Sequence, residues 1–224
     1  FNVLESAKTE DIEQILITST SETYGSAQYV PIDENHPLVG QSPYSASKIA
    51  ADQLATSYFK SFGLKVKIAR PFNTYGPRQS ARAIIPTIIS QILKNDGKIN
   101  IGSLSPTRDL TYVQDTCRGF ISIAKLHDLY GEVMNIGTNS EISIKALIET
   151  ISNLMQVEVS INIDNNRVRP EESEVDRLVC DSKKILTETD WSPIFTLEKG
   201  LLETIDWLKN VDLDSLYKPN QYNV

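Results

Sequence analysis

Two polar residues near the start of this chain have the types and spacing needed for acid–base chemistry. Tyr44 and Lys48 are four residues apart, so on a helix they share one face. A phenol, with a pKa near ~10, is a poor base at neutral pH, but a neighbouring ammonium favours its ionised form. Such a pair can exchange a proton with a hydroxyl group during a hydride transfer. The spacing alone is weak evidence, since many helices carry it by chance.

Further polar clusters follow two predicted strands on either side of this pair. A short, uniformly apolar strand over residues 14–20 ends in the Thr-Ser-Glu sequence of residues 20–22. The next strand, over residues 64–69, is followed by a polar stretch from Arg70 to Arg78. Ligands of doubly wound folds bind at the carboxyl ends of parallel strands. These two clusters, together with the Tyr44 and Lys48 pair between them in the chain, therefore predict one site.

The elements that position these residues follow from the capping and turn signals. Ser42 and Pro43 predict a helix start and Gly63 its end, which gives a helix over residues 42–62 between the two strands. Strand, loop, helix and strand in this order are typical of a parallel sheet. Beyond a short helix over residues 1–7, further helices are predicted over residues 82–94, 114–126, 143–155, 182–188 and 197–208, and strands over residues 99–101, 109–113, 132–136 and 157–163.

Composition excludes several classes of function. The formal net charge of −7 argues against a general nucleic-acid binder, which normally has a basic surface. Cys117 and Cys180 lack metal-ligand spacing and favour two reduced thiols over a disulfide. His36 and His127 have no clustered carboxylates, so no metal site is expected. No apolar run approaches the roughly 20 residues of a membrane span, and no signal peptide is visible, which predicts a cytoplasmic protein without a membrane partner.

The motifs together resemble a known family. With Tyr44-Ser-Ala-Ser-Lys48 and Arg70-Pro-Phe-Asn-Thr-Tyr-Gly-Pro-Arg78, the chain resembles the extended short-chain dehydrogenase/reductases, in their nucleotide-sugar epimerase and dehydratase branch, over essentially its full length. This resemblance implies an α/β fold: the C-terminal portion of a Rossmann-type doubly wound parallel sheet, plus a smaller α/β substrate-binding lobe. Residues 1–101 would form the catalytic part of the Rossmann-type domain, residues 114–137 would return to it, and residues 102–224 would mainly form the lobe.

One hallmark of that fold is missing from the sequence. No strand is followed by Gly-x-x-Gly-x-x-Gly, the phosphate-binding loop that opens a Rossmann fold. In the family this loop precedes the point that matches Phe1, and the chain begins without Met. We therefore expect that an N-terminal part of the fold lies upstream of Phe1, together with most of the dinucleotide cradle.

The strand-end motif favours one activity within the branch. Thr20-Ser21-Glu22 resembles the strand-end motif of GDP-mannose 4,6-dehydratases, whereas simple 4-epimerases have no carboxylate there. The surrounding sequence, including Pro31-Ile-Asp-Glu-Asn-His-Pro-Leu38, is similar to that of nucleotide-activated N-acetylglucosamine 4,6-dehydratases of the legionaminic-acid type. The resemblance thus implies an NAD-dependent 4,6-dehydratase acting on GDP- or UDP-N-acetylglucosamine. A nucleotide-sugar 4-epimerase and a non-catalytic NAD-binding scaffold are the alternatives.

In the implied reaction, Tyr44 takes the O4 proton while hydride leaves C4 for NAD⁺. The resulting ketone acidifies the C5 hydrogen, which Glu22 removes, and hydride finally returns from NADH to C6. Thr20 would steady the developing alkoxide. The proton for the departing C6 hydroxyl could come from Glu22 or through water from Ser21, and the sequence leaves this open.

The resemblance also implies the binding residues. NAD would contact Thr18, Ser19, Tyr44, Lys48 and Pro71. Arg side chains would hold the nucleotide diphosphate, because a guanidinium matches phosphate oxygens. The substrate-binding candidates are Asn73, Arg82, Arg108, Asn135, Arg169 and Glu174. In this family the helix with the Tyr and Lys also builds a dimer interface, so a homodimer is expected.

The missing phosphate loop generates a testable prediction. Isothermal titration of the 224-residue chain with NAD⁺ is expected to show no tight binding, because the diphosphate of NAD would lack its main-chain cradle. The full-length protein, titrated in parallel, is expected to bind. Micromolar binding by the 224-residue chain alone would contradict the prediction.

Overall fold

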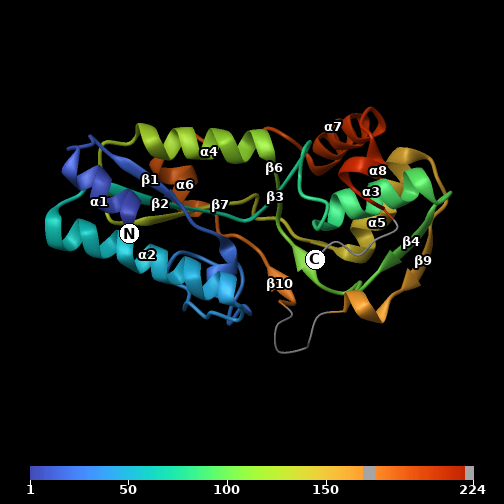
Figure 1. The fold of residues 1–224 in the computed structure, drawn as a ribbon, viewed down its shortest axis with the longest axis horizontal. Helices are drawn as coiled ribbons and strands as arrows, with labels where there is room; N and C mark the ends of the chain where they lie inside the picture. Colours follow the sequence, from blue (N-terminus) through green and yellow to red (C-terminus); the bar gives the residue numbers. More distant parts are fainter. Residues whose placement is uncertain (169–174, 220–224) are drawn as a thin grey trace.

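A computed structural model describes residues 1–168 and 175–219 of the chain. Its centre is a three-stranded parallel sheet of β1 (Ile15–Thr18), β2 (Val66–Pro71) and β7 (Val133–Ile136), in the order β1-β2-β7 (Figure 1). Ile68 pairs with Ile17 on one side and with Val133 on the other. Because β2 is the middle strand, its side chains are buried along most of its length, as expected of a parallel sheet.

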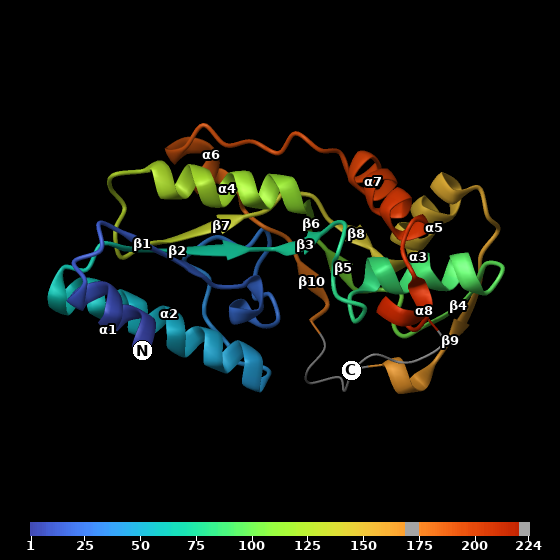
Figure 2. The same ribbon diagram turned by 45° about the horizontal axis from the view of Figure 1, so that its top comes forward.

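Helices cover both faces of this sheet (Figure 2). One face packs against α1 (Asn2–Thr9) and α2 (Pro43–Phe62) through a cluster that includes Leu4, Ala55 and Val66. The other face packs against α4 (Val113–Lys125) and α6 (Lys183–Glu188), with Trp191 at the centre of that cluster. The doubly wound arrangement predicted from the sequence is thus confirmed.

The ends of α2 match the sequence signals. Ser42 caps the helix by accepting a hydrogen bond from the Ser45 amide at 3.1 Å, and Ser45 Oγ accepts one from the Ser42 amide at 3.0 Å. Gly63 ends the helix in the left-handed conformation, with φ 69° and ψ 15°. Among the apolar residues of α2, Tyr58 is buried, whereas Ala46 and Ala50 are exposed. The homodimer stays a prediction.

A buried lysine ties the middle strand to α4. Lys67 is 2% exposed, and its ammonium donates hydrogen bonds to the carbonyls of Ile123, at 2.8 Å, and Leu126. These carbonyls lie at the C-terminal end of α4, where backbone acceptors lack helical partners and the helix dipole favours a cation. Burial lowers the pKa of Lys67. The contact explains how a lysine can lie on the middle strand of the sheet.

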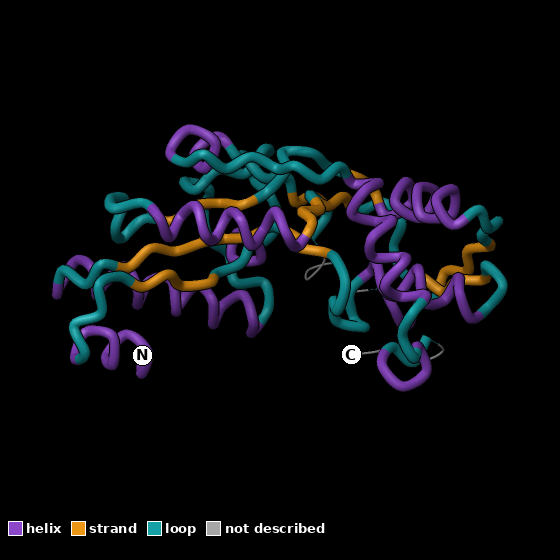
Figure 3. The backbone as a smooth tube through the Cα atoms, turned by 90° about the horizontal axis from the view of Figure 1, so that it is seen from above, coloured by secondary structure: helices purple, strands orange, loops and turns teal. Residues whose placement is uncertain are grey.

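The rest of the chain forms a second lobe around its own core (Figure 3). Its elements are α3 (Ile84–Lys94), β4 (Lys98–Ile101), α5 (Ile144–Met155), β9 (Ser160–Ile163), α7 (Leu197–Lys209) and α8 (Leu213–Leu216). β4 pairs with β9 at the far end of the lobe. The predicted boundary at residue 101 differs from this packing, because Ile88 of α3 and Ile99 of β4 share a core with Leu147 of α5.

Short strands connect the two halves. β3 (Asn73–Tyr75) pairs in parallel with β6 (Leu110–Tyr112), and β5 (Thr107–Arg108) lies between β8 (Ile142–Ser143) and β10 (Arg177–Leu178). β3 lies inside the polar stretch from Arg70 to Arg78, where β6 provides its partner strand.

Three observations bear on the classes of function considered from composition. Cys117 is exposed, Cys180 is buried, and both are free. Across residues 1–168 and 175–219, no helix has the length and apolar character needed to cross a membrane. The same ranges contain no group of three or more metal-ligating side chains.

The C-terminus of α2 provides a test of this local structure. Gly63→Ala is expected to lower the free energy of unfolding by about 1–2 kcal/mol, because a Cβ disfavours the left-handed conformation. A Cβ at Gly63 would meet no atom within 4 Å, so no clash adds to this cost. Gly63→Asn is expected to cost less, since Asn tolerates that conformation. Urea denaturation of the three proteins measures the difference, and equal stability of the Ala variant and the wild type would contradict it.

Candidate active site

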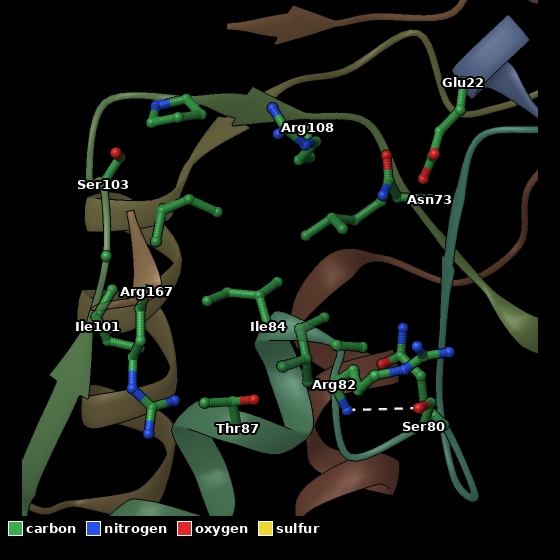
Figure 4. Close-up of a pocket in the computed structure, with 17 residues that line it drawn as sticks. Glu22, Asn73, Ser80, Arg82, Ile84, Thr87, Ile101, Ser103, Arg108 and Arg167 are labelled. Atoms are coloured by element: carbon green, nitrogen blue, oxygen red, sulfur yellow. Dashed lines mark hydrogen bonds between the residues drawn. The ribbon is translucent and has the colours of Figure 1, made fainter. Parts of the chain in front are cut away.

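A pocket of about 420 Å³ opens beside the carboxyl end of the parallel strands (Figure 4). Its lining comes from η1 (Ser21–Tyr24), the segment after β2, the start of α3, the end of β4 and the strands that join the two halves. The lining residues are Glu22, Asn73, Gln79, Ser80, Arg82, Ala83, Ile84, Ile85, Thr87, Ile101, Gly102, Ser103, Pro106, Arg108, Leu110, Ile144 and Arg167. Four of the predicted site residues are therefore brought together: Glu22, Asn73, Arg82 and Arg108.

The pocket has a polar end with a carboxylate and an amide. The side chain of Glu22 points toward that of Asn73, and Arg108 lies along the same rim (Figure 4). Among the described lining residues, Glu22 is the one carboxylate. The Oδ1 atom of Asn73 and the Oε1 atom of Gln79 are buried without a hydrogen-bond partner in the described part of the chain. Buried acceptors are normally paired, so these two lining atoms favour a ligand with hydroxyl or amide donors.

Local hydrogen bonds fix the direction of Glu22. Thr20 caps η1 by accepting a hydrogen bond from the Glu22 amide at 3.3 Å, and Thr23 Oγ1 donates to the Thr20 carbonyl at 2.8 Å. Ser21 and Thr23 are buried on either side, which leaves the Glu22 side chain exposed to the pocket. The structure therefore separates two adjacent candidates, with Glu22 in the pocket and Ser21 inside the protein.

A smaller adjoining pocket of about 100 Å³ connects this region to α2. It is lined by Glu22, Gln41, Ser42, Ser45, Asn73, Arg108, Val175 and Leu178. The first turn of α2 thus shares a cavity with the carboxylate. Tyr44 belongs to this turn, and its side chain is 53% exposed, although it lines neither of the two pockets.

Lys48 is held at the end of the first strand. Its ammonium donates to the Thr18 carbonyl at 2.6 Å, and Thr18 itself is exposed. This contact fixes α2 against β1 on the helix face that also carries Tyr44. Pro71, the last residue of β2, is half-buried at the neighbouring strand end. Exposed Tyr44 and Thr18, with Lys48 between helix and strand, leave polar groups facing outward at this edge.

Two further predicted site residues point into the protein, as Ser21 does. Ser19, expected to contact the cofactor, is 3% exposed and donates to the Asp52 carboxylate at 2.6 Å. Asn135, expected to contact substrate, is fully buried. Its side chain accepts from Tyr24 and donates to the Ile32 carbonyl. The resemblance implied both contacts, but Asp52 of α2 covers Ser19, and Tyr24 and Ile32 in the segment before α2 cover Asn135. Two other candidates, Arg169 and Glu174, lie outside the described residues.

Two arginines of the pocket, Arg108 and Arg167, lie on the connecting strands and in the second lobe, and hydrogen bonds hold their side chains in place. Arg108 is half-buried and donates to the carbonyls of Thr107, at 2.8 Å, and Val175, at 2.7 Å. Arg167, which the sequence did not single out, lines the same pocket and donates to Asp164 at 3.1 Å. Its only sequence signal is its place at the start of the charged segment that ends at Arg177.

A buried carboxylate beside Arg108 explains its fixed position. Asp109 is fully buried and accepts hydrogen bonds from the amides of Thr138, Asn139 and Cys180 and from the Thr138 hydroxyl, at 2.6–3.2 Å. Burial raises the pKa of Asp109, whereas these four donors act in the opposite direction. The contacts join the start of β6 to the segment after β7, and so hold Arg108 at the pocket rim.

Comparison with known proteins places this arrangement in a family. The sequence model of the family described as "GDP-mannose 4,6 dehydratase" matches residues 1–204. The chain belongs to the GDP-mannose 4,6-dehydratase family. Its similarity extends to both activities considered from the sequence. A putative UDP-glucose 4-epimerase of Methanocaldococcus jannaschii is 32% identical over 93% of this chain, and human dTDP-D-glucose 4,6-dehydratase is 32% identical over 93% of it.

Solved structures of family relatives share the fold. A dTDP-glucose 4,6-dehydratase from Bacillus anthracis, in complex with NAD, matches 98% of this chain with 31% identity and a TM-score of 0.83. A UDP-glucuronic acid 4-epimerase from Bacillus cereus, in complex with UDP-glucuronic acid and NAD, matches 92% with 29% identity and a TM-score of 0.85. This family member spans 68% and 65% of those two chains, and 67% and 60% of the Methanocaldococcus and human proteins.

The groups at the end of β1 fit the part of NAD that undergoes redox chemistry. Tyr44 and Thr18 are exposed there, and Lys48 lies beside them on the strand end. The fit does not extend to the diphosphate of NAD, because the 224 residues contain no glycine-rich phosphate loop. In this family member the described residues thus fit one end of the cofactor, with the roles of Tyr44 and Lys48 remaining predictions.

Arg108 gives a direct test of the pocket as a diphosphate site. Arg108→Gln is expected to weaken binding of UDP or GDP by about 10-fold or more, because a charge-assisted hydrogen bond contributes about 1.5–3 kcal/mol. Isothermal titration with both nucleotides measures the effect. Arg177→Gln, an exposed arginine that pairs with Glu141 outside the pocket, is the matched control. If the two variants bind the nucleotides with equal affinity and have unchanged melting temperatures, Arg108 does not contact the diphosphate.

Proposed function

We propose that this chain carries the catalytic part of an NAD-dependent nucleotide-sugar 4,6-dehydratase that acts on GDP- or UDP-N-acetylglucosamine. The observation that carries the proposal is the carboxylate of Glu22, which is exposed in the pocket and points toward Asn73. A dehydratase needs a base for the hydrogen on C5, and a carboxylate is adequate once a ketone at C4 has acidified that carbon. Oxidation at C4 alone, as in an epimerase, has no use for this group.

The proposed chemistry begins at the hydroxyl on C4. When bound, NAD supplies the redox chemistry, accepting hydride from C4 and later delivering it to C6. Tyr44 takes the proton of the O4 hydroxyl, and Lys48, held on the Thr18 carbonyl, supplies the neighbouring positive charge. In the proposed reaction Thr20 donates to O4 through its hydroxyl, while its own oxygen accepts from the Glu22 amide.

Glu22 then carries the elimination. Its carboxylate takes the C5 proton, the C5–C6 double bond forms, and the C6 hydroxyl leaves as water after receiving that proton from Glu22. Ser21, the other candidate for this last step, is buried and lines neither pocket, which favours Glu22 as the only acid. A solvent proton finally returns to C5 as hydride reaches C6. One water is lost overall, and the product is a 4-keto-6-deoxy sugar.

The two-ended pocket supports a nucleotide sugar as substrate. Its polar end carries Glu22 and an unpaired acceptor of Asn73 for sugar hydroxyls or an amide, and arginines follow along the wall for the diphosphate. Isoleucines at the start of α3, the end of β4 and the start of α5 line the remainder, which suits the flat face of a base. The alternative is a 4-epimerase, which the Methanocaldococcus relative favours.

One substitution separates the two activities. The full-length protein is incubated with GDP- and UDP-N-acetylglucosamine in D₂O, and the products are followed by NMR. The wild type is expected to give a 4-keto-6-deoxy sugar with deuterium at C5. Glu22→Gln is expected to reduce its formation by about 100-fold or more, since removal of a general base costs about 10²–10⁴. If the wild type and Glu22→Gln instead form, at equal rates, a C4 epimer that keeps its C6 hydroxyl, the activity is that of an epimerase.

A further inference from the structure

A buried ion pair lies directly behind the proposed catalytic residues. The Asp52 Oδ2 atom accepts three hydrogen bonds: from Ser19 Oγ at 2.6 Å, from Arg70 Nε at 3.0 Å and from Arg70 Nη2 at 2.8 Å. The three residues are 1–3% exposed. Three donors on one oxygen define a direction as well as a distance, so Asp52 has a single position relative to the strand ends.

The same guanidinium continues the network toward η1. Arg70 Nη1 donates to the Tyr24 hydroxyl at 3.0 Å, and its carbon lies 4.9 Å from the centre of the Tyr24 ring. The Tyr24 hydroxyl in turn donates to Asn135 Oδ1 at 2.8 Å. Burial raises the pKa of Tyr24 to about 12, so this phenol remains a donor at neutral pH. Arg70 therefore has two arms, one toward α2 and one toward η1.

Each member of the network adjoins a segment with proposed chemistry. Asp52 follows Lys48 by one helical turn and Tyr44 by two, on the same face of α2. Ser19 immediately precedes Thr20, and Tyr24 belongs to the same short helix as Glu22. Arg70 is followed after two residues by Asn73, which lines both pockets. Three segments that are distant in sequence, residues 19–24, 44–52 and 70–73, thus meet at one guanidinium–carboxylate pair.

We propose that Asp52 and Arg70 are positioning residues for this reaction, holding Tyr44 and Lys48 in register with Thr20 and Glu22. The inference rests on the proposed function only in assigning the chemistry to those four residues. The hydrogen bonds from Arg70 and Ser19 fix the rotation and height of α2 against β1. The bond to Tyr24 fixes η1, and with it the direction of Glu22. Neither Asp52 nor Arg70 lines the pockets, so both act through their neighbours.

A pair of variants distinguishes positioning from mere stabilisation. Asp52→Leu or Arg70→Met alone leaves a buried charge without its partner and is expected to lower the melting temperature strongly. The double variant removes both charges, and replacing a buried pair by apolar residues often leaves stability unchanged. The double variant is expected to regain the melting temperature of the wild type. Its kcat is expected to stay about 100-fold below that of the wild type, as for a misplaced catalytic group, whereas KM changes far less. Recovery of kcat together with stability would overturn the proposal.

Conservative variants of the second arm provide a test that does not depend on the double variant. Tyr24→Phe keeps the ring beside Arg70 and removes only the hydroxyl that contacts Arg70 and Asn135. It is expected to slow deuterium incorporation at C5 about 10-fold or more, because η1 no longer holds Glu22 in place. Tyr29→Phe removes a hydroxyl that contacts Asp33 on the exposed loop, and is the matched control. Equal exchange rates in the two variants would contradict the role of this arm.

Failure of this proposal is distinguishable from failure of the dehydratase assignment. If the wild type forms an epimer and no 4-keto-6-deoxy sugar, the proposed function is wrong, yet oxidation at C4 still depends on Tyr44. The Asp52→Leu/Arg70→Met variant then tests the positioning role through the kcat of epimerisation, with the same expected loss. If the wild type is a dehydratase and the double variant retains its kcat, only the positioning role is wrong.

Discussion

The guanidinium of Arg70 is buried at the carboxyl end of the middle strand, where water cannot solvate its charge. A charge in that environment requires an ionised partner and satisfied donors, and loss of the partner costs about 3–5 kcal/mol. Asp52 of α2 provides that partner, and Tyr24 accepts from the nitrogen that Asp52 does not contact. The helix therefore cannot slide along the sheet without exposing an unpaired charge. The positions of Tyr44 and Lys48, on the same helix face, follow from this electrostatic requirement.

The parts of this structure that could be predicted from the sequence are those governed by local interactions. The ends of α2 depend on a serine that caps the first turn of the helix and on a glycine that adopts a left-handed conformation. Both signals can be read from the residue types alone. The parallel sheet follows from apolar strands separated by a helix. Glu22 was placed in the site for a comparable reason, because a residue just beyond a strand in an α/β fold faces the ligand edge.

The parts that could not be predicted depend on contacts between distant segments. Ser19 and Asn135 have the same strand-end setting as Glu22, yet both are buried because α2 and the loop before it cover them. The role of Asp52 became visible only with Arg70 beside it, although its spacing from Lys48 continues the helix face. Likewise α3 and β4, contiguous with the first half in sequence, join the core of the second lobe because α5 and α7 offer them apolar surface.

The two activities found among the relatives both begin with a step at the C4 hydroxyl, and the Asp52–Arg70 network is proposed to position the residues for that step. A 4-epimerase and a 4,6-dehydratase both oxidise the hydroxyl at C4, so both would use the proposed Tyr44 and Lys48 pair, and the fold does not choose between them. The choice depends on a group outside the network. Glu22 is exposed in the pocket, and no ion pair within the described residues engages it. A base must be free to receive a proton, and a carboxylate held by an arginine would lose that capacity. The separation of the buried, paired charges of Asp52 and Arg70 from the exposed, unpaired carboxylate of Glu22 is therefore the physical argument for the elimination that we propose.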